Sequence, residues 1–181
     1  NVIRRLPVSG RAYATRAELY YLSGEYERSL TDFNESIRLD PSKADVFDGR
    51  GNTFIGLKQY DRAIEDYSEA LRIDPKNAQA YSDRGVAWYF KKNAEAAIRD
   101  YDEALRLEPH RTHTIVNRAA AWKDLGRIDL ALRDESEAIR LNPTDPHFRS
   151  NRGLSYADKK DYNRAIADYD EAIRLMPDYA P

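Results

Sequence analysis

The sequence contains no cysteine and no apolar run approaching the roughly 18 residues that a transmembrane helix needs. The first absence excludes disulfide frameworks and thiolate metal sites, and it leaves the cellular compartment open. An excess of positive charge is also missing, since 29 basic residues face 31 acidic ones for a formal net charge of −2. We therefore expect neither nucleic acid nor a membrane as a partner.

Catalytic motifs are missing as well. The sequence has no glycine-rich phosphate loop and no nucleophile elbow, and no strand is expected that would carry either. Its histidines are His110, His113 and His147, and no acidic residue at matching spacing completes a metal-ligand set with them. We expect no enzymatic activity, no cofactor and no metal.

The N-terminus gives little information on location. No secretory leader is recognisable, and the chain begins at Asn1 without a methionine, as a fragment of a longer protein would. The sequence does not identify the compartment; the cytoplasm is the favoured expectation and a bacterial periplasm is the alternative.

What the sequence does contain is a strict period of 34 residues. Prolines recur at this step, and so do two charged columns that run in register with them. The prolines are Pro41, Pro75, Pro109, Pro143 and Pro177; the arginine column is Arg16, Arg50, Arg84, Arg118 and Arg152; the aspartate column is Asp32, Asp66, Asp100, Asp134 and Asp168. A period of this length without insertions is typical of a solenoid built from one repeated unit.

Each period contains two helical stripes. In the second stripe of residues 44–77, Ala63, Ile64, Tyr67, Ala70 and Leu71 fall at i, i+1, i+4, i+7 and i+8, which is one face of a helix. An earlier stripe of Phe47, Gly51 and Phe54 predicts a first helix, so each unit is a helical hairpin.

Punctuation residues support the same boundaries. Gly24 and Gly126 fall between the two helices, where a left-handed residue ends the first one. The recurrent proline ends the second helix, because it lacks an N–H and restricts the residue before it. Asp145 followed by Pro146 predicts an N-cap and a first helical residue.

Two packing columns complete the pattern. A small residue recurs at Ala17, Gly51, Gly85, Ala119 and Gly153, and an aromatic residue recurs at Tyr20, Phe54, Trp88, Trp122 and Tyr156. With these columns the sequence resembles the tetratricopeptide repeat (TPR) family over nearly its whole length. The resemblance implies an all-α, right-handed superhelical solenoid of five TPR hairpins, at residues 10–43, 44–77, 78–111, 112–145 and 146–179, with 1–9 as the stub of a preceding repeat or a linker.

The sequence departs from the family at two places. Glu135 stands where the other units have Phe33, Tyr67, Tyr101 and Tyr169, so the fourth unit is loosened unless this carboxylate finds a partner or solvent. The arginine column stands where the family usually has leucine. We expect its members to pair with the aspartate column as a structural ladder, rather than to form an anion-binding stripe.

The resemblance also implies a ligand-binding concave face made by the first helices. Carried over to this sequence, the candidate residues are Tyr21, Asp45, Asp48, Asn52, Gln79, Asp83, Val86, Tyr89, Phe90, His113, Asn117 and Asn151. We expect Asp45, Asp48 and Asp83 to lie near Tyr89 and Phe90, which favours a ligand with basic and apolar groups. The basic clamp by which some family members hold an acidic chaperone tail is not expected, because only single positions match it.

The expected function is therefore a scaffold that binds a protein or peptide partner. The alternatives are a substrate-presenting or regulatory region of a larger enzyme, and a self-assembly module. The last unit carries an apolar stripe of Ala165, Ile166, Tyr169, Ala172 and Ile173, with too few residues after it for a covering helix. A homodimer through this C-terminal repeat, or further helical sequence in the native protein, would cover the stripe.

Overall fold

A computed structural model describes residues 9–176 of the chain. Within that range there are ten helices, each 13 or 14 residues long, so the expected all-α class and paired hairpins are confirmed. They are α1 (Gly10–Leu22), α2 (Tyr26–Leu39), α3 (Ala44–Gly56), α4 (Tyr60–Ile73), α5 (Ala78–Phe90), α6 (Ala94–Leu107), α7 (Thr112–Asp124), α8 (Ile128–Leu141), α9 (Pro146–Asp158) and α10 (Tyr162–Leu175).

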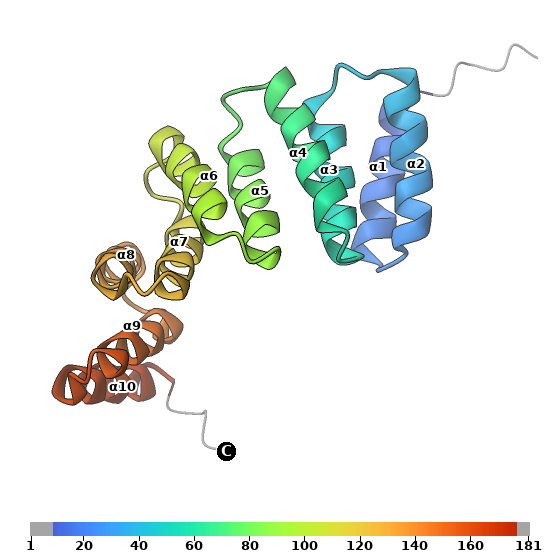
Figure 1. Ribbon diagram of the computed structural model, residues 1–181. Coiled ribbons are helices and arrows are strands. Elements are labelled where there is room, and N and C mark those ends of the chain that lie inside the picture. Colours follow the sequence, from blue (N-terminus) through green and yellow to red (C-terminus); the bar gives the residue numbers. More distant parts are fainter. Residues whose placement is uncertain (1–8, 177–181) are drawn as a thin grey trace, which may run out of the picture. The chain divides into compact units, whose positions relative to one another are not determined.

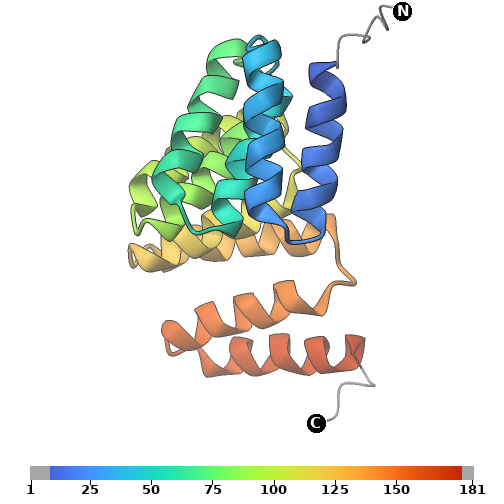
Figure 2. The same cartoon turned by 90° about the vertical axis from the view of Figure 1, so that its right-hand side faces the viewer.

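The helices belong to two compact units, which are described separately. The first unit extends to Lys91 and holds α1–α5, each helix packed against the next one along the chain (Figure 1). The second unit begins at Lys92 and holds α6–α10 in the same succession. Figure 2 shows α9 and α10, the last pair, lying side by side as a hairpin.

Helix ends follow the punctuation of the sequence. The second helices α2, α4, α6 and α8 each stop two residues before a proline of the lattice, whereas Pro177 and residues 1–8 lie outside the described range. Asp145 caps α9 by accepting a hydrogen bond from the backbone N–H of His147, with Pro146 as the first helical residue, as predicted. Gly24 and Gly126 have φ angles of 77° and 69°, as expected at left-handed turns.

Lysine takes this left-handed position in the other three hairpins. Lys58, Lys92 and Lys160 have φ angles of 58°, 62° and 62°. A residue with a Cβ is strained there by about 1–2 kcal/mol, so the packing of the two helices must outweigh that cost. The turn geometry is therefore set by the hairpin and not by glycine alone.

Glycine in the first helix makes room for a tyrosine in the second. Tyr67 of α4 is fully buried, and a Cβ added at Gly51 would come within 2.7 Å of its Cε1 atom. Gly153 faces Tyr169 in the same way, with a closest approach of 3.2 Å. Where the small residue is Ala119 instead of glycine, the facing residue is Glu135 and not tyrosine. Ala17 packs in one cluster with the buried ring of Phe33, so glycine at this place accompanies the tyrosines and not every ring.

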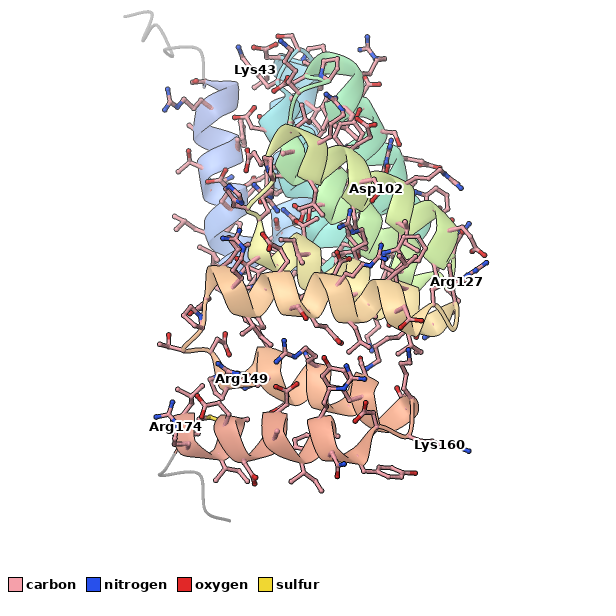
Figure 3. The ribbon with its side chains drawn as sticks, turned by 90° about the vertical axis from the view of Figure 1, so that its left-hand side faces the viewer. Lys43, Asp102, Arg127, Arg149, Lys160 and Arg174 are labelled. Carbon is pink, nitrogen blue, oxygen red and sulfur yellow. The ribbon has the colours of Figure 1, made fainter. Side chains whose placement is uncertain are left out.

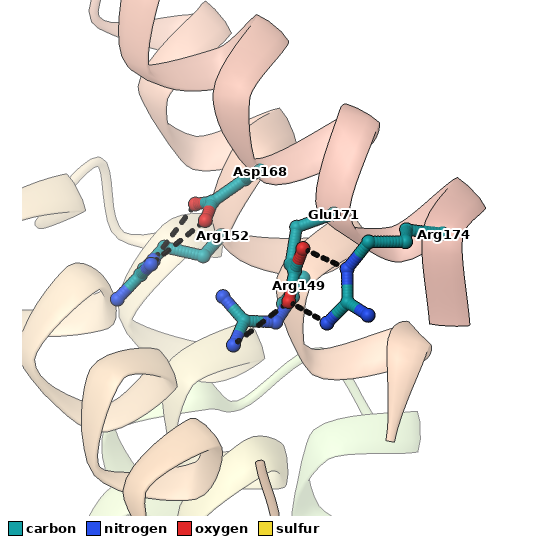
Figure 4. Close-up of polar contacts among 5 residues, drawn as sticks. All are labelled: Arg149, Arg152, Asp168, Glu171 and Arg174. Atoms are coloured by element: carbon teal, nitrogen blue, oxygen red, sulfur yellow. Dashed lines mark hydrogen bonds and ion pairs between the residues drawn. The ribbon is translucent and has the colours of Figure 1, made fainter. Parts of the chain in front are cut away.

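The arginine and aspartate columns meet inside the hairpins. Arg50 donates from Nε and Nη2 to the two carboxylate oxygens of Asp66, at 2.8 and 2.6 Å. The same two-pronged contact joins Arg16 to Asp32, Arg118 to Asp134 and Arg152 to Asp168, the last of which is drawn in Figure 4. Each of these four aspartates is at most 8% exposed, so the guanidinium satisfies a carboxylate that water hardly reaches.

A further nitrogen of these arginines, Nη1, donates to a side chain of the preceding hairpin. Arg118 Nη1 lies 2.7 Å from Asp102 on α6, and Arg50 Nη1 lies 2.7 Å from the side-chain oxygen of Asn34 on α2. At the same lattice place Arg84 bonds Ser68 and Arg152 bonds Ser136, at 3.0 and 3.2 Å. One arginine therefore fastens its own hairpin and joins it to the helix before.

We predict that Gly51→Ala destabilises the first unit by about 1–3 kcal/mol, because the Tyr67 ring has no room to move away. Gly153→Ala is the matched control. Tyr169 is 37% exposed and can shift, although the backbone oxygen of Ala165 also lies 3.3 Å from the added Cβ, so the loss of stability there should be smaller than at Gly51. Urea unfolding of both variants measures the difference, and equal effects would show that the buried ring is not the cause.

We predict that Asp66→Ala destabilises the first unit by about 1–3 kcal/mol, since it leaves Arg50, only 21% exposed, without its carboxylate. Asp32→Ala removes an equally buried aspartate, but its partner Arg16 is 57% exposed and water can replace the lost acceptor. The Asp32 variant should lose less stability in the same unfolding experiment. The reverse order would contradict this account of the ladder.

Candidate functional site

A small pocket opens between the first three helices. Its volume is about 230 Å³, and its walls are Glu18, Tyr21, Phe33, Asp45, Asp48, Gly49 and Asn52. Four of these residues, Tyr21, Asp45, Asp48 and Asn52, are among those predicted from the sequence. Three of the lining residues are carboxylates, and none of them is basic. The pocket is therefore suited to a positively charged group.

Asp48 is the least satisfied carboxylate of the pocket. Its Oδ2 accepts a hydrogen bond of 2.7 Å from the side-chain amide of Asn77, while its Oδ1 is buried and has no hydrogen-bond partner among the described residues. Burial raises the pKa of Asp48 to about 7 despite the Asn77 bond, and the nearby negative charges of Asp83 and Asp45 act in the same direction. A cation in the pocket would offset both the cost of burying the negative charge of Asp48 and its repulsion by Asp83 and Asp45.

Polar residues of α3, α4 and α5 surround this carboxylate. Tyr67 donates from its hydroxyl to Asn52 Oδ1 at 2.7 Å, and Gln79 donates from its amide to Asp83 Oδ1 at 2.7 Å. Burial raises the pKa of Tyr21, and the charge of Asp83 contributes to that rise. Asp83 on α5 is thus electrostatically coupled to the pocket between α1 and α3.

The predicted aromatic pair lies elsewhere on α5. Phe90 is 49% exposed and stacks on Tyr60 of α4, with ring centroids 5.2 Å apart. Tyr89 is tilted against Phe90 at 6.4 Å, and Val86 is partly buried one turn earlier. These rings are not among the residues that line the acidic pocket.

The remaining predicted residues belong to the second unit. His113 and Asn117 lie on α7 and Asn151 lies on α9; His113 and Asn151 are exposed, and Asn117 is partly buried. Within residues 9–176, no group of three or more His, Asp and Glu side chains is arranged to hold a metal ion. None of the helices in that range has the length and apolarity to cross a membrane.

Sequence reasoning missed two members of the pocket region. Glu18 adds the third carboxylate to the lining, and Asn77, the N-cap of α5, holds Asp48 from the next hairpin. Asn77 bonds the backbone N–H of Ala80 with its oxygen and Asp48 with its nitrogen. The capping pattern of the sequence marks Asn77 as a helix start, but only the fold shows that its other end faces Asp48.

The second unit has its own surface of paired charges. Arg149 on α9 and Arg174 on α10 are labelled at the same end of that pair in Figure 3, and Figure 4 shows both approaching Glu171. Arg174 bonds Glu171 at 2.6 Å, and Arg149 lies 3.9 Å away. A glutamate and an arginine three residues apart, as in Glu171 and Arg174, recur in each hairpin. Each of these exposed pairs contributes about 0.2–0.5 kcal/mol, and together they form a solvated face.

Glu135 occupies the place of a ring between α8 and α9. It is only 3% exposed; its Oε1 accepts a hydrogen bond of 2.8 Å from the hydroxyl of Ser155, and its Oε2 has no partner among the described residues. Burial raises the pKa of Glu135 to about 7, although Ser155, Lys123 on α7 and Arg152 on α9 favour its ionised form. The sequence predicts that Glu135 needs a partner or solvent. That partner is Ser155, which satisfies Oε1 only.

We predict that ionisation of Glu135 destabilises the second unit. Its pKa rises from an ordinary 4.5 to about 7 on folding, so its favourable contribution is complete below pH 4.5 and is lost as the pH rises through 7. One pKa unit corresponds to about 1.4 kcal/mol, so a rise from 4.5 to about 7 makes the full loss about 3–4 kcal/mol. Glu135→Gln should therefore gain stability relative to the wild type as the pH increases from 5 to 8.

Glu137→Gln is the control, because Arg140 holds the pKa of the exposed Glu137 below its usual value. Its stability relative to the wild type should not improve over the same pH range. Denaturant unfolding at several pH values gives both differences. A constant difference between Glu135→Gln and the wild type would show that this carboxylate is not protonated on folding.

Comparison with known proteins agrees with the helix pairs. The TPR repeat family matches residues 51–92, and tetratricopeptide repeat families match residues 10–43 and 148–179; together these segments span more than half of the chain. No curated protein matches the sequence.

Several solved structures share the fold. A MamA fragment from Desulfovibrio magneticus RS-1 is 16% identical with a TM-score of 0.87, covering 95% of this chain and 97% of that one. YrrB, described as a TPR protein with an unusual peptide-binding site, is 24% identical with a TM-score of 0.77, covering 92% and 86%. PilF from Pseudomonas aeruginosa is 23% identical with a TM-score of 0.82, covering 92% and 76%.

At these identities the likeness to solved structures establishes the fold alone. The family is established by the 34-residue lattice, by the helical hairpins that follow it, and by the three matched segments. The chain therefore belongs to the tetratricopeptide repeat family.

Proposed function

We propose that this chain is a protein-interaction scaffold whose first unit binds a peptide segment carrying a basic side chain. The observation that carries the proposal is the pocket of Glu18, Asp45 and Asp48, which gathers three carboxylates without a basic side chain in its lining. Elsewhere in the first unit, as at Arg50 and Asp66, a buried carboxylate has an arginine beside it. Asp48 has an amide instead.

The pocket fits one lysine or arginine side chain. Tyr21 and Phe33 offer apolar walls to the aliphatic stem, while the charged end meets the carboxylates. Residues of the peptide on either side would extend over α3 and α5, where Gln79 and Asp83 lie, toward the exposed ring of Phe90. YrrB, which has the same fold, is described as having a peptide-binding site, and this supports the proposal by analogy.

Selection of peptides from a random library on the purified chain tests the proposal. The peptides that bind should be enriched in lysine or arginine next to apolar residues. Their affinity should fall as salt is added, because the charges of the pocket are partly open to solvent. Enrichment of acidic peptides, or binding that salt does not weaken, would contradict the proposed site.

We predict that Asp48→Lys combined with Asp83→Lys weakens binding of a selected peptide at least about tenfold, which corresponds to about 1.4 kcal/mol. Glu65→Lys on the exposed side of α4 makes one such charge reversal outside the pocket and should leave the affinity within about twofold. Isothermal titration gives the affinities, and thermal unfolding verifies that each variant is folded. If the Asp48 and Asp83 changes leave the affinity intact, the peptide uses another surface.

The pH dependence of peptide affinity gives a second test of the same site. A cationic ligand favours ionised Asp48, so affinity should increase as the pH rises through about 7 and level off above it. Asp48→Asn cannot ionise and should remove this part of the pH dependence.

A further inference from the structure

The first and last described helices expose faces that the other hairpins bury. At each junction between hairpins, a first helix contributes one small side chain to the packing against the preceding second helix. Thr53, Ala87, Ala121 and Ser155 hold this place, and each is 0% exposed. Leu19 holds the same place on α1, yet it is 62% exposed.

The matching face is exposed on α10. Ile166, Tyr169 and Ile173 are 58%, 37% and 69% exposed. Their lattice equivalents on α4 are Ile64, Tyr67 and Leu71, which are 9%, 0% and 7% exposed because α5 covers them.

The structure also shows what covers such a face. Ala87 of α5 packs in one cluster with Ile64 and Tyr67, and Ala80 of α5 packs in another with Leu71. On α1 the lattice equivalents of these two alanines are Leu19 and Ala12, both exposed. The chain thus carries an uncovered second-helix face on α10 and an uncovered first-helix face on α1, where Leu19 replaces the small residue of the internal junctions.

Charges at the two faces are complementary in the same register. The arginine column reaches the preceding second helix at Asn34, Ser68, Asp102 and Ser136, and the next residue on that lattice is Asp170 of α10. Asp170 is exposed, and Arg16 of α1 is 57% exposed, compared with 22% for Arg118. The 2.7 Å contact of Arg118 with Asp102 shows the geometry of such a pair.

We propose that a second copy of this chain docks its α1 onto α10, head to tail, in the lattice order of the internal junctions but with the two helices held further apart by the larger Leu19. Leu19 and Ala12 of one copy then cover Ile166, Tyr169 and Ile173 of the other, and Arg16 donates to Asp170 across the interface. Both apolar stripes leave water, which is the main driving force. Because the two surfaces differ, the contact is heterologous and permits open chains of copies instead of a closed dimer.

Sedimentation of the purified chain across the micromolar range tests this contact. The wild type should increase in mass with concentration. Leu19→Lys and Ile166→Lys each block one of the two faces, at side chains exposed enough for the fold to tolerate the change. Each variant alone should be monomeric, and an equimolar mixture of the two should form a one-to-one complex, because the mixture retains one intact pair of faces.

A further pair of variants tests the proposed ion pair between Arg16 and Asp170. Asp170→Asn should weaken self-association at least about threefold, whereas Asp102→Asn, at the same lattice place inside the chain, should leave it unchanged. A wild type that stays monomeric throughout the range would overturn the proposal. Self-association of Leu19→Lys equal to that of the wild type would also overturn it, since the contact would then be a symmetric dimer through α10.

Discussion

The buried aspartate of each hairpin is the constraint on which the rest of this structure depends. A carboxylate enclosed between two helices is costly unless a fixed cation meets it, and the arginine of the facing helix supplies that cation with two parallel hydrogen bonds, as Arg50 does for Asp66. Its third donor continues to the helix before, as from Arg118 to Asp102. The same arginine therefore contributes to closing its hairpin and to joining it to the neighbouring one, and short helices of 13 or 14 residues gain a defined register from it.

Two further carboxylates have no hydrogen-bonded arginine within residues 9–176. Asp48 and Glu135 each keep one buried oxygen without a partner among the described residues, and burial raises the pKa of both to about 7. The surroundings of the two carboxylates differ. Asp48 lines a pocket that a ligand can enter, whereas Glu135 is 3% exposed between α8 and α9. This difference supports the proposal that Asp48 binds a ligand, whereas Glu135 is a local weakness in packing, although the electrostatic origin is the same.

The sequence predicts the helical hairpins because proline, glycine and apolar spacing act locally. It also predicts the candidates Tyr21, Asp45, Asp48 and Asn52 through the resemblance, since the lattice defines which side of a first helix each occupies. The link from Arg118 to Asp102 was not predicted, because that lattice place varies among Asn34, Ser68 and Ser136 and gives no column to notice. The stacking of Phe90 on Tyr60 was not predicted either, because it is a contact between hairpins that periodicity does not encode. Glu18 holds the same lattice place as Asn52 and Val86, so the repeat register could have identified it.

A double-mutant cycle at Arg118 tests the central claim most directly. Arg118 is 22% exposed and bonds both Asp134 of its own hairpin and Asp102 of the preceding helix, so each coupling is measurable against the same residue. With Arg118→Met, Asp134→Asn and Asp102→Asn, the account predicts a coupling energy of about 1–3 kcal/mol to Asp134 and a smaller one, below about 1 kcal/mol, to the half-exposed Asp102. Coupling to neither carboxylate would contradict the claim that one arginine holds both the hairpin and its junction.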